Sequence, residues 1–164
     1  MGGFADLAGS VIIDRMTDWI EHFREAACGM PVSHVWRGHG SALFIELGAL
    51  TPTTRRDGSS GNPMGEIGLM IEWSWRIEDA RSIACGSWSD EVLWQPSFNR
   101  LFGREVIDLT TFGRLPEIML SLSGDLYVAS FMTAEGDPEW SLFDRRGPVP
   151  IAVGCRSGAI TNEA

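Results

Sequence analysis

Two histidines and a glutamate near the start of the chain are of the residue types that bind transition metals. His34 and His39 lie five residues apart, Glu46 follows them and Cys28 precedes them. Imidazole, thiolate and carboxylate groups are the usual zinc ligands. Residues five apart on a straight strand point to opposite faces, so the two histidines converge only if the chain bends at the glycines around His39. The spacing favours one packed and one exposed histidine, and we expect no metal and no other cofactor.

Acidic and basic residues on neighbouring segments could form an acid/base pair flanked by guanidinium groups that bind anions. The residues concerned are Arg37, Glu46, Glu72 and Arg76. With His39 replacing Arg37, the same set gives the candidate catalytic residues of a small hydrolase or carbohydrate-binding enzyme. Cross-strand ion pairs on an exposed sheet face would use the same residue types, and the pattern favours that interpretation.

Seven tryptophans raise the question of ligand stacking, because flat aromatic faces match the apolar faces of sugars. Trp73 and Trp75 alternate with polar residues on the same face as Ile71, and Trp19 lies on an apolar helical stripe. We therefore expect Trp73 and Trp75 in the core, against the N-terminal helix near Trp19 or Phe23. The tryptophans left as stacking candidates are Trp36, Trp88, Trp94 and Trp140.

Motifs for nucleophilic catalysis or phosphate binding are missing from the sequence. It contains no GxSxG, no GxxxxGKS or GxxxxGKT, and no GxGxxG between a strand and a helix. The three cysteines, Cys28, Cys85 and Cys155, are widely spaced and form no CxxC pair, which argues against a disulfide framework and a zinc site. His22 precedes Cys28 by six residues, a spacing that does not place both on one helical face.

The first element that the sequence predicts is a long amphipathic helix over residues 4–28. Its apolar residues recur at helical spacing, its other face is acidic, and Cys28-Gly29 followed by Pro31 resembles a helix end. An acidic polar face disfavours binding to anionic membranes, so the stripe should pack on the protein's own sheet or on a second copy.

Strands follow this helix. Residues 32–37 and 41–50 should form a hairpin, residues 51–63 a mobile polar loop, and residues 65–78 one strand with a buried face and a wet face. Residues 80–88 should return as a shorter strand, and a short helix should end at Gly103. The remaining predicted strands are residues 105–112, 116–123, 126–133 and 139–143 in a meander turned by Gly124-Asp125, then residues 150–156 within a partly flexible tail of residues 145–164.

The order of these elements predicts one α+β domain over residues 1–164. An antiparallel sheet, mainly a meander, should be packed by the long N-terminal helix and one short central helix. Strands before and after the central helix are also consistent with two duplicated strand groups or with a partly open barrel.

Four segments in the second half of the chain consist mostly of residues that are common in turns and in buried cores. They are Leu101-Phe-Gly-Arg-Glu-Val106, Gly113-Arg-Leu-Pro-Glu-Ile118, Leu120-Ser-Leu-Ser-Gly124 and Met132-Thr-Ala-Glu-Gly-Asp-Pro-Glu-Trp140. They resemble the C-terminal half of small uncharacterised bacterial proteins, over roughly residues 101–143. The resemblance implies a fold type and no known activity. Some such proteins are encoded near toxin and immunity genes, so it also implies an interaction role.

The charge of the chain bears on its partners. The net charge is -9, and all 13 basic residues are arginine. A negative surface repels phosphate backbones, so we expect no nucleic-acid partner and favour a basic protein surface. The first 14 residues lack Arg and Lys, and no apolar run approaches the ~20 residues that span a bilayer, so we expect a cytoplasmic protein without membrane contact.

These observations favour a non-enzymatic binding or regulatory, immunity-like module over an enzyme. The expected binding surface is the wet face of residues 65–78, with Glu66, Glu72, Glu78 and Arg76. A homodimer formed through the N-terminal helix or a sheet edge is a further expectation. The alternative function is the hydrolase or carbohydrate-binding enzyme that would use the cluster around Glu46.

Overall fold

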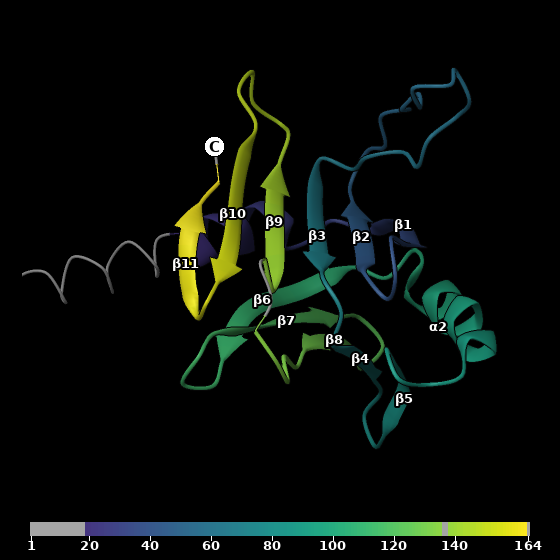
Figure 1. Ribbon diagram of the computed structural model, residues 1–164, viewed down its shortest axis with the longest axis vertical. Helices are drawn as coiled ribbons and strands as arrows, with labels where there is room; N and C mark the ends of the chain where they lie inside the picture. Colours follow the sequence, from purple (N-terminus) through teal and green to yellow (C-terminus); the bar gives the residue numbers. More distant parts are fainter. Residues whose placement is uncertain (1–18, 136–137, 164) are drawn as a thin grey trace, which may run out of the picture.

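The computed structural model describes residues 19–135 and 138–163, which form two open antiparallel sheets (Figure 1). The first sheet has six strands in the order β1-β2-β3-β9-β10-β11. These strands are β1 (Val32–Arg37), β2 (Leu43–Leu47), β3 (Ile67–Ile71), β9 (Trp140–Asp144), β10 (Ile151–Arg156) and β11 (Ala159–Asn162). The α+β class and the antiparallel pairing predicted from the sequence are thereby confirmed.

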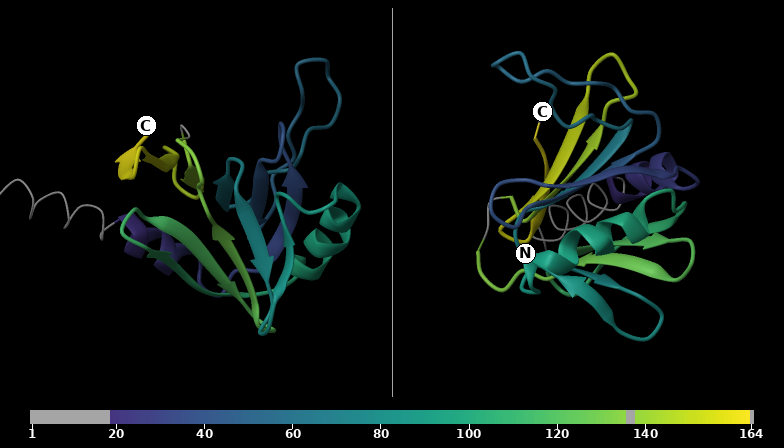
Figure 2. Two further views of the ribbon diagram at one scale, coloured as in Figure 1. Left: turned by 60° about the horizontal axis from the view of Figure 1, so that its bottom comes forward. Right: turned by 90° about the vertical axis from the view of Figure 1, so that its right-hand side faces the viewer.

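The second sheet has five strands in the order β5-β4-β8-β7-β6. They are β4 (Trp75–Glu78), β5 (Ile83–Gly86), β6 (Val106–Phe112), β7 (Glu117–Leu122) and β8 (Leu126–Ser130). The left view of Figure 2 shows the two sheets diverging as the sides of a wedge, with a helix on either side of the molecule.

The helices are short. Residues 19–27 are helical, a 3-10 turn η1 spans Glu91–Leu93, and α2 spans Trp94–Leu101. The long helix predicted over residues 4–28 is not supported, because the described helix has only its last part, and residues 4–18 lie outside the described residues. An apolar stripe shows which face of a helix packs, but it does not fix where the helix begins. None of the described helices is long and apolar enough to cross a membrane.

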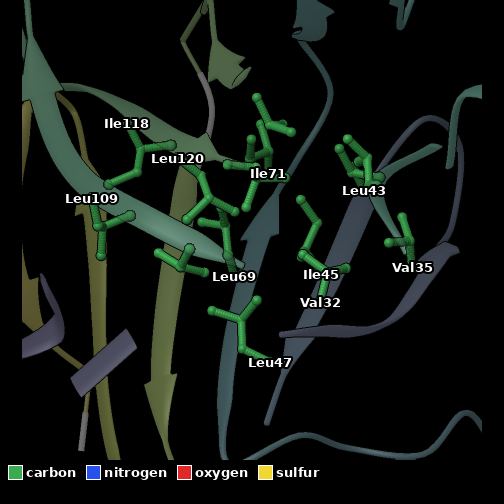
Figure 3. Close-up of a cluster of buried hydrophobic side chains, with 14 of the residues drawn as sticks. Val32, Val35, Leu43, Ile45, Leu47, Leu69, Ile71, Leu109, Ile118 and Leu120 are labelled. Atoms are coloured by element: carbon green, nitrogen blue, oxygen red, sulfur yellow. The ribbon is translucent and has the colours of Figure 1, made fainter. Parts of the chain in front are cut away.

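The core fills the space between the two sheets. In Figure 3, Leu109, Ile118 and Leu120 of the second sheet face Leu69 and Ile71 of the first. All five side chains are at most 2% exposed. Burial of such a side chain contributes about 1.5–3 kcal/mol, so this contact holds the sheets together.

The segment predicted as one strand, residues 65–78, is two strands in different sheets. Ile71 pairs with Leu43 and Trp140 in the first sheet, whereas Trp75 pairs with Ser130 in the second. Residues 72–74 carry the chain across. Alternation of apolar and polar residues continues through the bend, so the period could not reveal that the strand changes sheets.

Most predicted hairpins and turns are confirmed. β1 pairs with β2, β4 with β5, and Gly124 and Asp125 have φ values of 77° and 54° in the turn between β7 and β8. One part of the meander was wrong: β9 lies between β3 and β10 in the first sheet, not beside β8. The tail contains a second strand, β11, which follows a turn at Ser157 and Gly158.

The polar segment between β2 and β3 extends away from the sheets (Figure 1). Isolated bridges join Thr51 to Met64 and Thr54 to Ser60. At its tip the backbone N–H of Arg55 donates to the Ser59 carbonyl over 2.8 Å. The segment is thus a hydrogen-bonded arm, and its mobility stays a prediction.

Candidate functional site: a tryptophan-lined pocket

The residues predicted as a catalytic cluster lie in separate parts of the structure. Glu46 is on β2, only 2% exposed, and accepts hydrogen bonds from Arg145 (Nη1, 2.9 Å) and from the Gly65 backbone N–H (2.9 Å). Arg76 is on β4 in the other sheet, and His39 is exposed in the turn between β1 and β2. Among the described residues, no hydrogen bond or ion pair joins any two of the four candidates, Glu72 included.

The three glutamates predicted to form one acidic strand face are divided between the two sheets. Glu66 and Glu72 flank β3, and Glu78 ends β4. Arg76 pairs with Glu78, and its guanidinium lies 3.8 Å from the centre of the Phe131 ring. Because residues 72–74 cross between the sheets, these carboxylates do not share the face of a single strand.

The metal candidates are also apart. The His34 ring is hydrogen-bonded to Asn62 Oδ1 at 3.2 Å, and His39 is exposed in the turn. Across residues 19–135 and 138–163, no group of three or more potential ligands gathers in a way that could hold a metal ion.

The cysteine thiols are poorly placed for nucleophilic chemistry. Cys155 is 0% exposed, and its Sγ donates to Glu139 Oε2 over 2.9 Å. Burial and this nearby carboxylate raise the pKa of the Cys155 thiol far above its usual range. Burial likewise raises the pKa of Cys28. Since the thiolate is the reactive form, the raised pKa of each thiol disfavours both groups as nucleophiles near neutral pH.

Three tryptophans meet where the β3–β4 bend, the end of β5 and η1 come together. Trp73 is half-buried in the bend, Trp88 is 88% exposed after β5, and Trp94 is 5% exposed at the start of α2. Placing Trp73 and Trp75 together against the N-terminal helix was wrong. Trp75 instead packs on α2, with ring centroids 5.3 Å from Trp94 and 5.8 Å from Phe98.

These rings line an open pocket of about 470 Å³. The polar residues around it include Arg37 and Glu91 and three serines, Ser41, Ser87 and Ser89. A volume of this size falls in the range of about 300–1,000 Å³ that is usual for small-molecule sites. Apolar rings with a few convergent polar groups are the usual composition of such sites.

The serines fix the pocket walls through the backbone. Ser41 Oγ donates to the Trp73 carbonyl (2.9 Å), and Trp75 Nε1 donates to the Ser41 carbonyl (2.6 Å), which ties the β1–β2 turn to the β3–β4 bend. The Ser87 backbone N–H donates to the Trp75 carbonyl, and Trp94 Nε1 donates to the Ser89 carbonyl over 3.2 Å. The Trp73 backbone and the Trp94 ring are therefore held in place before any ligand binds.

Arg37 and Glu91 form an ion pair at the pocket. Arg37 Nη1 lies 2.6 Å from Glu91 Oε2, and Arg37 Nε donates to the Gly40 carbonyl over 2.5 Å. The guanidinium carbon lies 4.7 Å from the centre of the Trp94 ring. Gly40 has a φ of 63°, a conformation that glycine adopts at little cost, and this turn brings its carbonyl to Arg37.

Sequence reasoning found part of this pocket. Trp88 and Trp94 were stacking candidates, and Arg37 was placed in a polar cluster, but with Glu46 as its neighbour. Trp73 was missed because it continues the alternation of the preceding strand. Glu91 was not among the candidate residues, and nothing in its local pattern points to Arg37, 54 residues away in the sequence.

Comparisons of the chain with models of protein families, with curated proteins and with solved structures found no match. The resemblance of residues 101–143 to small bacterial proteins stays a prediction.

Proposed function

We propose that the protein is a non-enzymatic binding module whose ligand is a carbohydrate held in the tryptophan pocket. The observation that carries the proposal is the combination of three indole rings with an internally neutralised Arg37–Glu91 pair around an opening of about 470 Å³. A sugar ring has an apolar face that stacks on an indole and an edge of hydroxyl groups that both donate and accept hydrogen bonds.

The exposed Trp88 supplies a stacking platform. At 88% exposure its ring is largely free of protein contacts, so a ligand can cover it without displacing another side chain. Aromatic rings bury much area at low cost in side-chain entropy, which is why tryptophan is enriched at binding sites. Arg37 and Glu91 then offer a donor and an acceptor to hydroxyl groups at the ring edge.

The chemistry at the pocket favours binding over hydrolysis. Glycoside hydrolysis generally requires two carboxyl groups on either side of the scissile bond. Glu91 is the only carboxylate among the described lining residues, and it is paired with Arg37. Glu46, Glu72 and Arg76, from the predicted hydrolase cluster, do not line the pocket.

A glycan array followed by titration of tryptophan fluorescence tests the proposal. Binding of a neutral oligosaccharide should change the fluorescence, and Trp88→Ala should weaken the affinity by about tenfold or more, because it removes the stacking platform. Ile107→Ala is the matched surface control: Ile107 is 57% exposed on β6, outside the pocket lining. This control should bind as the wild type does.

Two results would contradict the proposal. One is the absence of binding to any glycan of the array by folded protein, established by circular dichroism. The other is equal loss of affinity in Trp88→Ala and Ile107→Ala, which would show that the pocket is not the site.

A basic protein partner is the second candidate, and the exposed apolar residues of η1 favour it. Val92 is 76% exposed and Leu93 48% exposed, next to Glu91 of the pocket, on a chain with a net charge of -9. Exposed apolar residues beside a tryptophan and an arginine are typical of protein interfaces. In a pull-down from the host lysate, a Val92→Asp, Leu93→Asp variant should lose a specific partner, whereas equal recovery with the wild type would reject this docking surface.

A further inference from the structure

Arg37 is already bonded to protein groups through two of its three guanidinium nitrogens. Its Nε is bonded to the Gly40 carbonyl at 2.5 Å and its Nη1 to Glu91 Oε2 at 2.6 Å, while one face of the guanidinium lies over Trp94. Arginine binds a carboxylate best through two parallel N–H groups. A carboxylate arriving at Arg37 would have to compete with Glu91 for those groups.

The charge around the pocket disfavours that competition. An anionic group beside Arg37 would lie close to the Glu91 carboxylate, and like charges a few Å apart repel even where solvent screens them. The chain adds a net charge of -9. A hydroxyl group meets no such penalty, because it can donate to Glu91 and accept from a remaining N–H of Arg37.

We infer that Glu91 is a selectivity residue that makes the pocket prefer uncharged sugars to sugar acids. The inference rests on the proposed carbohydrate function and adds the ligand class. Glu91 acts by pairing with Arg37: as long as the ion pair is formed, the pocket recognises hydroxyl groups. Without the carboxylate of Glu91, the guanidinium becomes a free anion site in the same position.

Matched ligand pairs test this directly. The probes are the methyl glycosides of glucose, galactose and mannose and the corresponding methyl uronides, which carry a carboxylate in place of the primary alcohol. Calorimetry at constant ionic strength should give the wild type at least about fivefold tighter binding of the neutral member of any pair that binds. Glu91→Gln should bind the uronide at least about fivefold more tightly than the wild type does.

Glu105→Gln is the control for overall charge. Glu105 is exposed and outside the pocket lining, and its replacement changes the net charge by the same amount as Glu91→Gln. It should leave the ratio of neutral to uronide affinity at the wild-type value. Circular dichroism should show an unchanged fold for both variants, since Glu91 is 66% exposed.

The outcomes distinguish the selectivity role of Glu91 from the proposed sugar site. If the wild type binds uronides as tightly as neutral sugars, or if Glu105→Gln shifts the ratio as much as Glu91→Gln, the selectivity role of Glu91 is overturned while the sugar site stands. An unchanged ratio in Glu91→Gln overturns it as well. If no member of any pair binds and the glycan array is also negative, the proposed function itself fails.

Discussion

The two sides of the wedge are closed by helices, but by different chemistry. The helix of residues 19–27 buries Phe23 in the core and is fastened at its surface by polar contacts, His22 to Asp144 at 3.0 Å and Arg24 to Asp108 at 2.6 Å. On the other side, α2 is fastened by rings, with Trp94 and Phe98 packed on Trp75. Figure 1 shows the two helices far apart, one behind β9 to β11 and the other beside β1.

This difference explains why the candidate site lies at α2. The charged side joins partners that satisfy one another: Asp144 accepts hydrogen bonds from His22 and from Arg146. The aromatic side leaves indole surface that the protein does not cover, at Trp88 and in part at Trp73. A ring packed on one face keeps its other face for a ligand, whereas the carboxylate of Asp144, at 5% exposure, leaves little surface for one.

The largest effect should come from the aromatic side of the core. Trp75→Ala should lower the free energy of unfolding by about 3–5 kcal/mol, because the ring is 3% exposed and its loss leaves a cavity against α2. Urea denaturation measures the change. Trp88→Ala, at an 88% exposed position, should change stability by less than about 0.5 kcal/mol.

Equal destabilisation by Trp75→Ala and Trp88→Ala would contradict the distinction between a core tryptophan and a free binding surface. It would mean that Trp88 supports the fold as much as Trp75 does, and the pocket would then be a packing defect of the core instead of a binding surface. A small effect of Trp75→Ala would instead show that α2 is held by other contacts.

The sequence predicted local structure well where a local signal exists. Alternation and turn residues identified the β1–β2 hairpin and the Gly124-Asp125 turn, whose positive φ values need such residues. The end of the first helix at Cys28-Gly29 was also found, with Gly29 at a φ of 86°. Each of these features depends on residues that are neighbours in the chain.

The predictions that were wrong concern contacts between residues that are distant in the chain. Alternation predicted the buried faces of β3 and β4 but could not assign them to different sheets, so Trp73 was placed in the core and the glutamates on one face. β9 was assigned to the wrong sheet for the same reason. The Arg37–Glu91 pair joins the end of β1 to a 3-10 helix, and only the tertiary fold brings them together.

On the side of the helix of residues 19–27, acidification should weaken the stabilising contacts of Asp144. The expected loss of stability is intermediate in size. Hydrogen bonds from the Arg146 side chain and backbone, together with His22, lower the pKa of Asp144 from 3.8 to about 2. A carboxyl group whose pKa is lowered on folding stabilises the protein above its unfolded pKa and loses that contribution as the pH falls through the folded pKa. The free energy of unfolding should therefore fall by on the order of 2 kcal/mol between about pH 4 and pH 2.

Urea titrations at a series of pH values measure this loss in the wild type and in Asp144→Asn. The variant should be less stable near pH 7 and should show a flatter dependence below pH 4, since it lacks the titrating group. Asp125→Asn is the control, because Asn tolerates the left-handed turn that Asp125 adopts at a φ of 54°. An acid dependence in Asp144→Asn as steep as in the wild type would show that other carboxyl groups fasten this side.

The smallest expected effect separates stacking from hydrogen bonding at the pocket. The Nε1 atoms of Trp73 and Trp36 are buried, and neither has a hydrogen-bond partner among the described residues. Trp73→Phe and Trp36→Phe should each change the free energy of unfolding by less than about 1 kcal/mol, because the loss of an unsatisfied donor offsets the loss of ring area.

Sugar affinity should also stay within about threefold of the wild type in Trp73→Phe, since phenylalanine keeps a flat face toward the pocket. Trp36 stacks on Phe44 at 4.0 Å outside the pocket lining, so Trp36→Phe gives the same change of chemistry without a change at the site. Fluorescence titration of both variants with one neutral glycan decides the matter. A loss of affinity beyond about tenfold in Trp73→Phe alone would show that the indole N–H turns toward the ligand and donates to it. Ligand recognition on the aromatic side would then depend on a polar contact, as the attachment of the helix of residues 19–27 does on the other side.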